Sequence, residues 1–188
     1  QRDRWLQNHL LTPKTASLPF SFLYDEQVSG DFLPAWRNRV RQEKLDDVRT
    51  RHILTWKDRR TGLEVSCAAV VYSDYPVVEW TVYLTNTGKT ATPIVKDIQA
   101  LDIQMERSGD GEFLLHGIKG DFCTADSFEP YQIPLAPDLV KNFAPPPYSG
   151  KSSDGPEGWP YFNLQIPGGG LMLAVGWPGQ WAASFIRD

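Results

Sequence analysis

The residues of this chain with the clearest chemical potential are aromatic side chains close to turns, one of which follows a carboxylate. The segment Ser29-Gly30-Asp31-Phe32 places an acidic and an aromatic side chain in a stretch that contains glycine. Further tryptophans fall near predicted turns or strand ends: Trp36, Trp159, Trp177 and Trp181. Aromatic rings offer flat apolar faces, and carboxylates accept hydrogen bonds from hydroxyl groups. Sugar rings need both partners, since their C–H faces stack on indoles and their hydroxyls require polar groups.

A second interpretation makes the same side chains structural. The chain holds seven tryptophans, and Trp, Tyr and Phe together make up 12% of it. Rings bury a large apolar area wherever they lie, so the residues alone favour a core role for any single tryptophan. By the same argument, Ser29-Gly30-Asp31-Phe32 can be a β-turn whose Phe32 fills the core. Both interpretations stay open at this point.

The histidines and acids of the sequence do not form a recognisable catalytic set. The three histidines stand far apart, and no G-x-S-x-G segment accompanies them: His9, His52 and His116. Asp97, Asp102 and Glu106 lie near one another, but on a segment with the character of a strand. Hydrolysis of a glycoside needs two carboxyl groups facing each other across the bond, which closeness in sequence does not provide. We expect no catalytic residue, no metal ligand set and no cofactor in this chain.

Alternating segments are the elements that must position these residues. In Val78–Leu84, the residues Val78, Trp80, Val82 and Leu84 share one face, as expected of a half-buried strand. Further strands are predicted for segments with similar patterns: Val48–Trp56, Leu63–Val71, Ile94–Met105 and Glu112–Ile118. Turn residues, including Gly168-Gly169-Gly170, separate such runs. Short strands at this spacing predict an all-β fold, a sandwich or barrel with little helix.

Composition narrows the classes of partner. The formal net charge is −4, and the basic run Arg37 to Lys44 is mixed with acids, so we expect a solvated strand edge or turn there and no nucleic-acid partner. No apolar run reaches the length of a membrane span, so no membrane partner is expected. Cys67 and Cys123 are too few and too far apart for a disulfide framework, and Cys67 is expected to be buried.

One long segment departs from the alternating pattern. Residues 124–158 contain seven prolines, including Pro145-Pro146-Pro147, and predict a long loop, because proline cannot donate to a sheet ladder. Only two or three strands follow Trp159, which is too few for an independent domain. We therefore predict a single β-sandwich domain over residues 1–188, interrupted by this loop.

Several segments together resemble the N-terminal domain of α-galactosidase-like glycoside hydrolases of family 36. The resemblance runs from about Leu18 to the end of the chain and rests on these pieces: Phe20–Tyr24, Lys44–Asp46, Thr61–Val65, Tyr75–Thr81, Asn86–Gly88, Asp97–Asp102 and Gly176–Trp181. It implies a large antiparallel β-supersandwich of two packed sheets, like that of galactose mutarotase. In this family the domain packs against a (β/α)₈ barrel that carries both catalytic aspartates, and we expect that barrel beyond the end of this chain.

The resemblance also implies a role for the candidate residues. In related enzymes a loop of this domain reaches into a sugar pocket, sometimes that of a neighbouring subunit, and Gly30-Asp31-Phe32 is similar to that loop. Here it continues as Leu33-Pro34-Ala35-Trp36, which departs from the family and leaves open whether the sugar is an α-galactoside or another α-glycoside.

The resemblance and the aromatic residues together leave three hypotheses. The first is a non-catalytic accessory domain that caps the barrel and shapes its sugar entrance, with homo-oligomer contacts as a further role. The second is an independent carbohydrate-binding module that uses Trp159, Trp177 and Trp181 as a stacking face. The third is a purely structural or oligomerisation domain. Location stays open between the cytoplasm and export.

Overall fold

The computed structural model describes residues 2–12, 17–106 and 111–188 of the chain. Strands take up 44% of the described residues and helices 8%, so the predicted all-β class with little helix is confirmed. The strands form antiparallel sheets in two compact units, Gln1–Gln104 and Met105–Asp188. The sequence predicts one domain over residues 1–188. Each unit nevertheless has its own hydrophobic core, and a single-domain arrangement stays a prediction.

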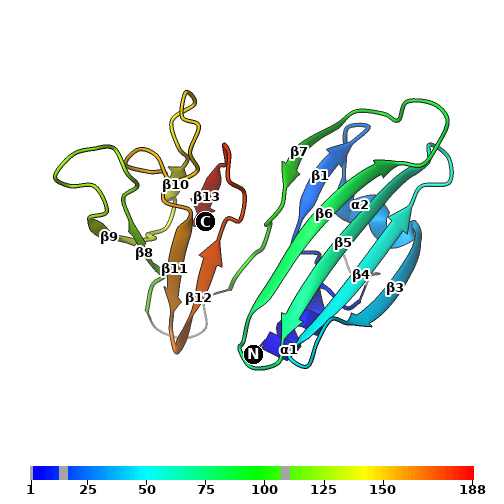
Figure 1. Ribbon diagram of the computed structural model, residues 1–188, viewed down its shortest axis with the longest axis horizontal. Coiled ribbons are helices and arrows are strands. Elements are labelled where there is room, and N and C mark those ends of the chain that lie inside the picture. Colours follow the sequence, from blue (N-terminus) through cyan, green and yellow to red (C-terminus); the bar gives the residue numbers. More distant parts are fainter. Residues whose placement is uncertain (1, 13–16, 107–110) are drawn as a thin grey trace. The chain divides into compact units, whose positions relative to one another are not determined.

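The first unit is built on a four-stranded sheet of order β3-β4-β5-β6. Its strands are β3 (Arg37–Lys44), β4 (Arg49–Lys57), β5 (Leu63–Tyr72) and β6 (Val78–Asn86). A smaller sheet of order β2-β1-β7 joins β2 (Gln27–Val28), β1 (Ser21–Tyr24) and β7 (Val95–Gln99). Figure 1 shows β1, β7 and helix α2 (Ser29–Phe32) behind the four-stranded sheet, and helix α1 (Arg2–His9) near one end of it.

The core of this unit lies between the two sheets. Side chains of β4 and β5 alternate between buried and less buried positions, as the sequence predicts, with Leu54, Trp56, Val65 and Cys67 fully buried. Phe22 and Tyr24 of β1 meet them from the smaller sheet, and Leu6 of α1 belongs to the same cluster. Apolar side chains on one face of each sheet thus hold the layers together, which is the general requirement of a sandwich.

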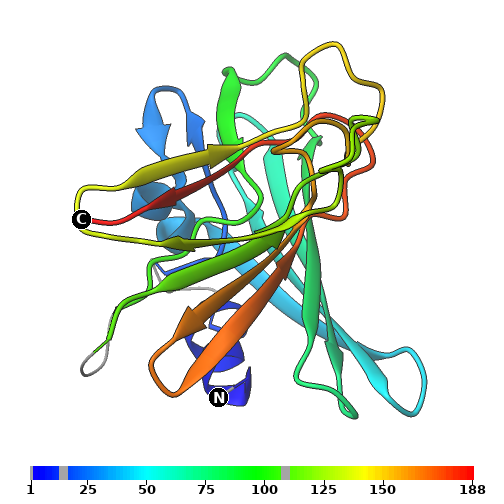
Figure 2. The same cartoon turned by 90° about the vertical axis from the view of Figure 1, so that its left-hand side faces the viewer.

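The second unit has two sheets of its own. One has the order β12-β11-β8-β9 and consists of β12 (Gly169–Ala174), β11 (Tyr161–Ile166), β8 (Leu114–Ile118) and β9 (Pro130–Pro134). The other pairs β10 (Val140–Phe143) with β13 (Ala183–Ile186), which run side by side in Figure 2. Phe143 and Phe162 join the two sheets, with their ring centroids 5.0 Å apart.

In this unit the structure corrects the prediction of a long loop and confirms that of a glycine turn. The segment 124–158 is not irregular throughout, because it contains β9 and β10. Proline is tolerated there because Pro130 and Pro134 stand at the two ends of β9, an edge strand with one unpaired side. The predicted glycine turn is confirmed: Ile166 pairs with Gly169, so Pro167 and Gly168 alone join β11 to β12, and Gly168 has a φ of 77°.

Two other strand predictions hold with shorter bounds. The segment predicted at Ile94–Met105 is strand only over Val95–Gln99, and that at Glu112–Ile118 begins at Leu114. The basic run forms β3, an edge strand of the large sheet with mostly exposed side chains, as expected. Among the described residues, no helix is long and apolar enough to cross a membrane.

Candidate functional site

The segment around Asp31 folds as a compact helical corner and not as an open turn. The short helix α2 is followed directly by a 3-10 turn at Leu33–Ala35, which has Pro34 in its first turn. Proline is preset to a helical φ and suits the start of such a turn. At the other end Ser29, only 1% exposed, accepts a hydrogen bond from the backbone N–H of Phe22 at 3.2 Å. Leu33 is fully buried, so the corner is anchored to the core on both sides of Asp31.

A cluster of three aromatic rings, those of Tyr24, Phe32 and Trp36, packs at this corner. The rings of Phe32 and Trp36 lie 4.8 Å apart and are inclined by 33°. Tyr24 of β1 contacts both rings at centroid distances of 5.9 Å, edge-on to Trp36 at 85°. The hydroxyl of Tyr24 donates to Thr61 Oγ1 at 2.6 Å, which fixes the tyrosine ring in turn. Ring pairs at such distances are favourable beyond the area that they bury, so the cluster forms a rigid base.

Asp31 is the exposed carboxylate of this corner. Over residues 2–12, 17–106 and 111–188 the structure gives its side chain no hydrogen-bond or ion-pair partner. Phe32 and Trp36 are half-buried, and both rings pack against the aromatic side chains of the first core. The corner thus carries one exposed acceptor for hydroxyl groups and, in the same segment, two partly exposed aromatic residues.

The other three candidate residues lie in the second unit and differ in exposure. Trp159 is half-buried and contacts two rings, those of Phe128 at 5.7 Å and Tyr161 at 6.0 Å. Both partners are 50% exposed, so these three residues form an accessible aromatic trio. Trp177 is 63% exposed. No ring contact joins Trp177 to the trio among the described residues.

Trp181 does not fit the stacking role predicted for it. Its side chain is only 9% exposed and belongs to the core of the second unit, with its ring edge-on to Phe162 at 6.0 Å. The indole N–H donates to the carbonyl of Ser152 at 2.7 Å. An indole with both faces packed leaves no surface for a sugar ring. The structural interpretation of the tryptophans therefore applies to this one.

The structure brings the rings of Phe32 and Trp36 into contact in the corner that also carries Asp31, and it adds partners that sequence reasoning missed. Tyr24 could have been found, since Phe20, Phe22 and Tyr24 alternate as the inner face of a strand. Phe128 gave no such signal. It meets Trp159 through a bend at which Phe128 itself has a φ of 66°, and neither periodicity nor composition encodes that bend.

Three of the acids and histidines considered for catalysis have hydrogen-bond partners within the described residues. Asp102 accepts a hydrogen bond from the hydroxyl of Ser21 at 2.5 Å, which ties the segment after β7 to β1. His116 Nε2 lies 2.9 Å from the side-chain oxygen of Gln165, and His9 Nδ1 lies 2.7 Å from the carbonyl of Ser17. Within the described part of the chain no group of three or more His, Cys, Asp or Glu side chains could hold a metal ion.

Comparisons of the chain with family models, curated proteins and solved structures find no match in any of the three. The arguments for function therefore rest on the residues and geometry described above.

Proposed function

We propose that this chain is a non-catalytic accessory β domain of an α-galactosidase-like glycoside hydrolase. In this role Asp31 accepts hydrogen bonds from sugar hydroxyls, while Phe32 and Trp36 supply an apolar wall. The catalytic acids belong to a (β/α)₈ barrel of the same parent protein, whose sugar entrance this domain helps to shape. Homo-oligomer contacts of the parent are part of the same proposal.

One observation carries the proposal: the exposed Asp31 is followed directly in α2 by Phe32, whose half-buried ring contacts that of Trp36. Asp31 costs nothing in lost internal contacts when a ligand engages it, since the described residues offer it no partner. The short helix fixes the backbone of Asp31, so only its side chain has to be ordered when a ligand binds. The sequence resemblance to family 36 gives this corner its proposed substrate, an α-galactoside or related α-glycoside.

The first test uses the chain alone. It is purified and assayed with a nitrophenyl α-galactoside, and no turnover above buffer is expected because the reaction needs two facing carboxyl groups from the barrel. Turnover that copurifies with the chain and survives repeated purification would overturn the assignment as non-catalytic.

The second test examines the parent protein. Reading the coding sequence downstream of Asp188 should reveal alternating strands and helices with two aspartates at strand ends. In that longer protein Asp31→Asn should lower kcat/KM by about tenfold or more, because a hydrogen bond to a charged acceptor is lost. Asp25→Asn is the matched control, since Asp25 is another exposed carboxylate of the same unit and its φ of 52° suits asparagine. Equal effects of the two substitutions would count against a sugar contact at Asp31.

A second candidate function rests on the aromatic trio of Phe128, Trp159 and Tyr161. Accessible aromatic rings are what a carbohydrate-binding module uses to stack sugars, and the trio lies entirely in the second unit. Titration of the chain with soluble polysaccharides, followed by tryptophan fluorescence, separates the two functions. Binding that Trp159→Ala abolishes and Asp31→Asn leaves intact favours the module over the accessory domain.

A further inference from the structure

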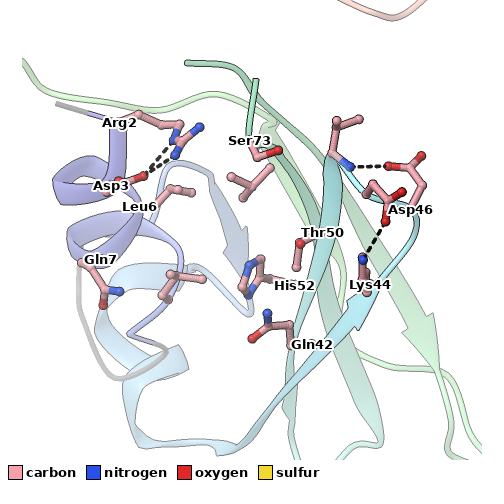
Figure 3. A pocket seen from close by; sticks show the side chains of 14 residues that line it. Arg2, Asp3, Leu6, Gln7, Gln42, Lys44, Asp46, Thr50, His52 and Ser73 are labelled. Atoms are coloured by element: carbon pink, nitrogen blue, oxygen red, sulfur yellow. Dashed lines mark hydrogen bonds and ion pairs between the residues drawn. The ribbon is translucent and has the colours of Figure 1, made fainter. Parts of the chain in front are cut away.

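A hollow of about 300 Å³ lies in the first unit, between α1 and the ends of β3, β4 and β5 (Figure 3). Its volume is at the lower end of the range for small-molecule sites. Gln42, Thr50 and His52 form the strand side of the hollow, and Figure 3 shows their side chains on the side of the sheet that faces α1. None of these residues belongs to the corner around Asp31.

The hollow exists because the inner face of the sheet changes character along β4. Leu54 and Trp56 on this face are fully buried in the core. The next two inward positions are His52 and Thr50, which are only half-buried. In the sheet register Gln42 stands directly opposite His52, so two polar side chains lie side by side on the same face. A face that would otherwise continue the core is polar at this end.

The charged groups around the hollow are already neutralised by one another. Arg2 pairs with Asp3 at 2.7 Å and also donates to the carbonyl of Tyr75 at 3.0 Å. Lys44 pairs with Asp47 at 2.9 Å. An ionic ligand would have to compete with these pairs for its partner.

Asp46 is the remaining charged group of the lining, and it too is occupied. Its carboxylate pairs with the guanidinium of Arg49 at 2.7 Å and accepts the backbone N–H of Val48 at 3.0 Å. The Arg49 contact and the backbone hydrogen bonds lower the pKa of Asp46, so it stays ionised and satisfied near neutral pH. The rim therefore contributes no unpaired charge to a ligand.

The neutral polar groups, in contrast, are available. Within the described residues the side chains of Gln42, Thr50 and His52 have no hydrogen-bond partner. Burial lowers the pKa of His52 below its usual 6.5, so its imidazole is uncharged near neutral pH and offers one donor and one acceptor. An amide, a hydroxyl and a neutral imidazole converge here, and each can both donate and accept. Leu6, Leu11 and Val71 add apolar surface to the same lining.

We propose that this hollow binds one small neutral molecule with several hydroxyl groups, of the size of a monosaccharide or cyclic polyol. Hydroxyl groups donate and accept in the same way as the three side chains that would meet them. The apolar lining suits the C–H face of such a ring. A charged ligand fits less well, because its charge would find no uncompensated counterpart. The proposal does not rest on the proposed function, since it involves neither Asp31 nor the aromatic residues discussed above.

The experiment follows the imidazole of His52 by NMR in the intact chain near neutral pH. The probes are D-glucose, D-galactose and myo-inositol, with gluconate and glucosamine as charged analogues. The chain has three histidines, so His116, which is hydrogen-bonded to Gln165 in the second unit, serves as an internal reference. A saturable shift of the His52 signal with at least one neutral probe, absent at His116, is expected.

Variants decide whether the binding belongs to the hollow. Thr50→Val keeps the branched shape and removes the hydroxyl, so it should weaken binding by about three- to tenfold, the range of one neutral hydrogen bond. Gln42→Met should act in the same direction. Thr55→Val is the matched control, because Thr55 lies on β4 with its side chain on the opposite face. Circular dichroism and thermal midpoints verify that each variant is folded.

Three outcomes overturn the proposal: no shift of His52 with any neutral probe at tens of millimolar, tighter binding of a charged analogue, or equal effects of Thr50→Val and Thr55→Val. Asp31→Asn should leave binding in the hollow unchanged. A failure here is therefore distinguishable from a failure at the corner around Asp31.

Discussion

The reactivity of Cys67 offers a sharp test of how β5 is oriented in the first unit. Its side chain is fully buried and points into the core between Val65 and Ala69, while Leu54 of β4 and Val82 of β6 stand opposite it in the register. A slip of one residue would turn this whole set outward and bury Ser66 and Ala68 instead. The thiol thus reports on the register of β5.

The size of the effect follows from burial. Loss of solvation raises the pKa of Cys67 from 9.0 to about 12. Only the thiolate attacks iodoacetamide, so near pH 8 the reactive fraction falls by roughly a thousandfold. Steric protection acts in the same direction. We expect Cys67 to be modified at least about a hundredfold more slowly than an accessible thiol.

The assay is time-resolved labelling with iodoacetamide, read by peptide mass spectrometry. Cys123 is exposed and provides the accessible thiol within the same molecule. In denaturant both cysteines should label at similar rates, which verifies that sequence context does not cause the difference. Labelling of Cys67 within about tenfold of Cys123 in the native chain would refute the buried, inward orientation of β5.

Three further predictions address other parts of the chain. Burial lowers the pKa of His52 below 6.5, so the unfolded chain binds a proton at this residue more readily than the folded chain does. The free energy of unfolding should therefore fall as the pH drops below 6.5. His52→Gln should reduce this pH dependence, which is measured by denaturant titrations above and below pH 6.5. Trp181→Phe should cost about 1–3 kcal/mol by leaving the Ser152 carbonyl unsatisfied, whereas Trp177→Phe should stay within about 0.5 kcal/mol in urea unfolding. Gly158→Ala should lower the thermal midpoint, because a Cβ at this position would clash with the carbonyl oxygen of Asp154. Gly176→Ala is the control and should leave the midpoint unchanged, because no atom lies within 4 Å of a Cβ there.

Alternation in the sequence was sufficient to predict the strands of the large sheet and their buried faces. Val78, Trp80, Val82 and Leu84 share the less exposed face of β6, as a period of two requires. Alternation failed to predict strands that are short and bounded by proline. The strand β9 spans only Pro130–Pro134, and no pattern of that length distinguishes a strand from a loop. Its pairing with β8 depends on a partner more than ten residues away, which local sequence does not encode.

The candidate corner was predictable in its residues but not in its shape. Asp31, Phe32 and Trp36 are close in sequence, so any compact local structure brings them together. The helical path through Leu33 and Pro34 depends on Leu33 being drawn into the core and Ser29 bonding to β1, which are tertiary effects. The burial of Trp181 is likewise tertiary: its sequence neighbourhood is rich in glycine and proline, and only the packing of Phe162 and the carbonyl of Ser152 assign it to the core.

The hollow beside α1 illustrates a general limit of pattern reading. Period two places Thr50 and His52 on the same face as Leu54 and Trp56, and from that alone all four belong to a core. Whether an inward position belongs to the core or to a site depends on what covers it. Here Leu6 of α1 and Leu10 just after it are buried, but room is left over Thr50 and His52. Apolar side chains at these two positions would extend the core and favour stability, as filling a cavity generally does. The polar side chains of Thr50 and His52 therefore make the fold less stable than apolar ones would. This loss of stability is the physical reason to look for a ligand at these positions.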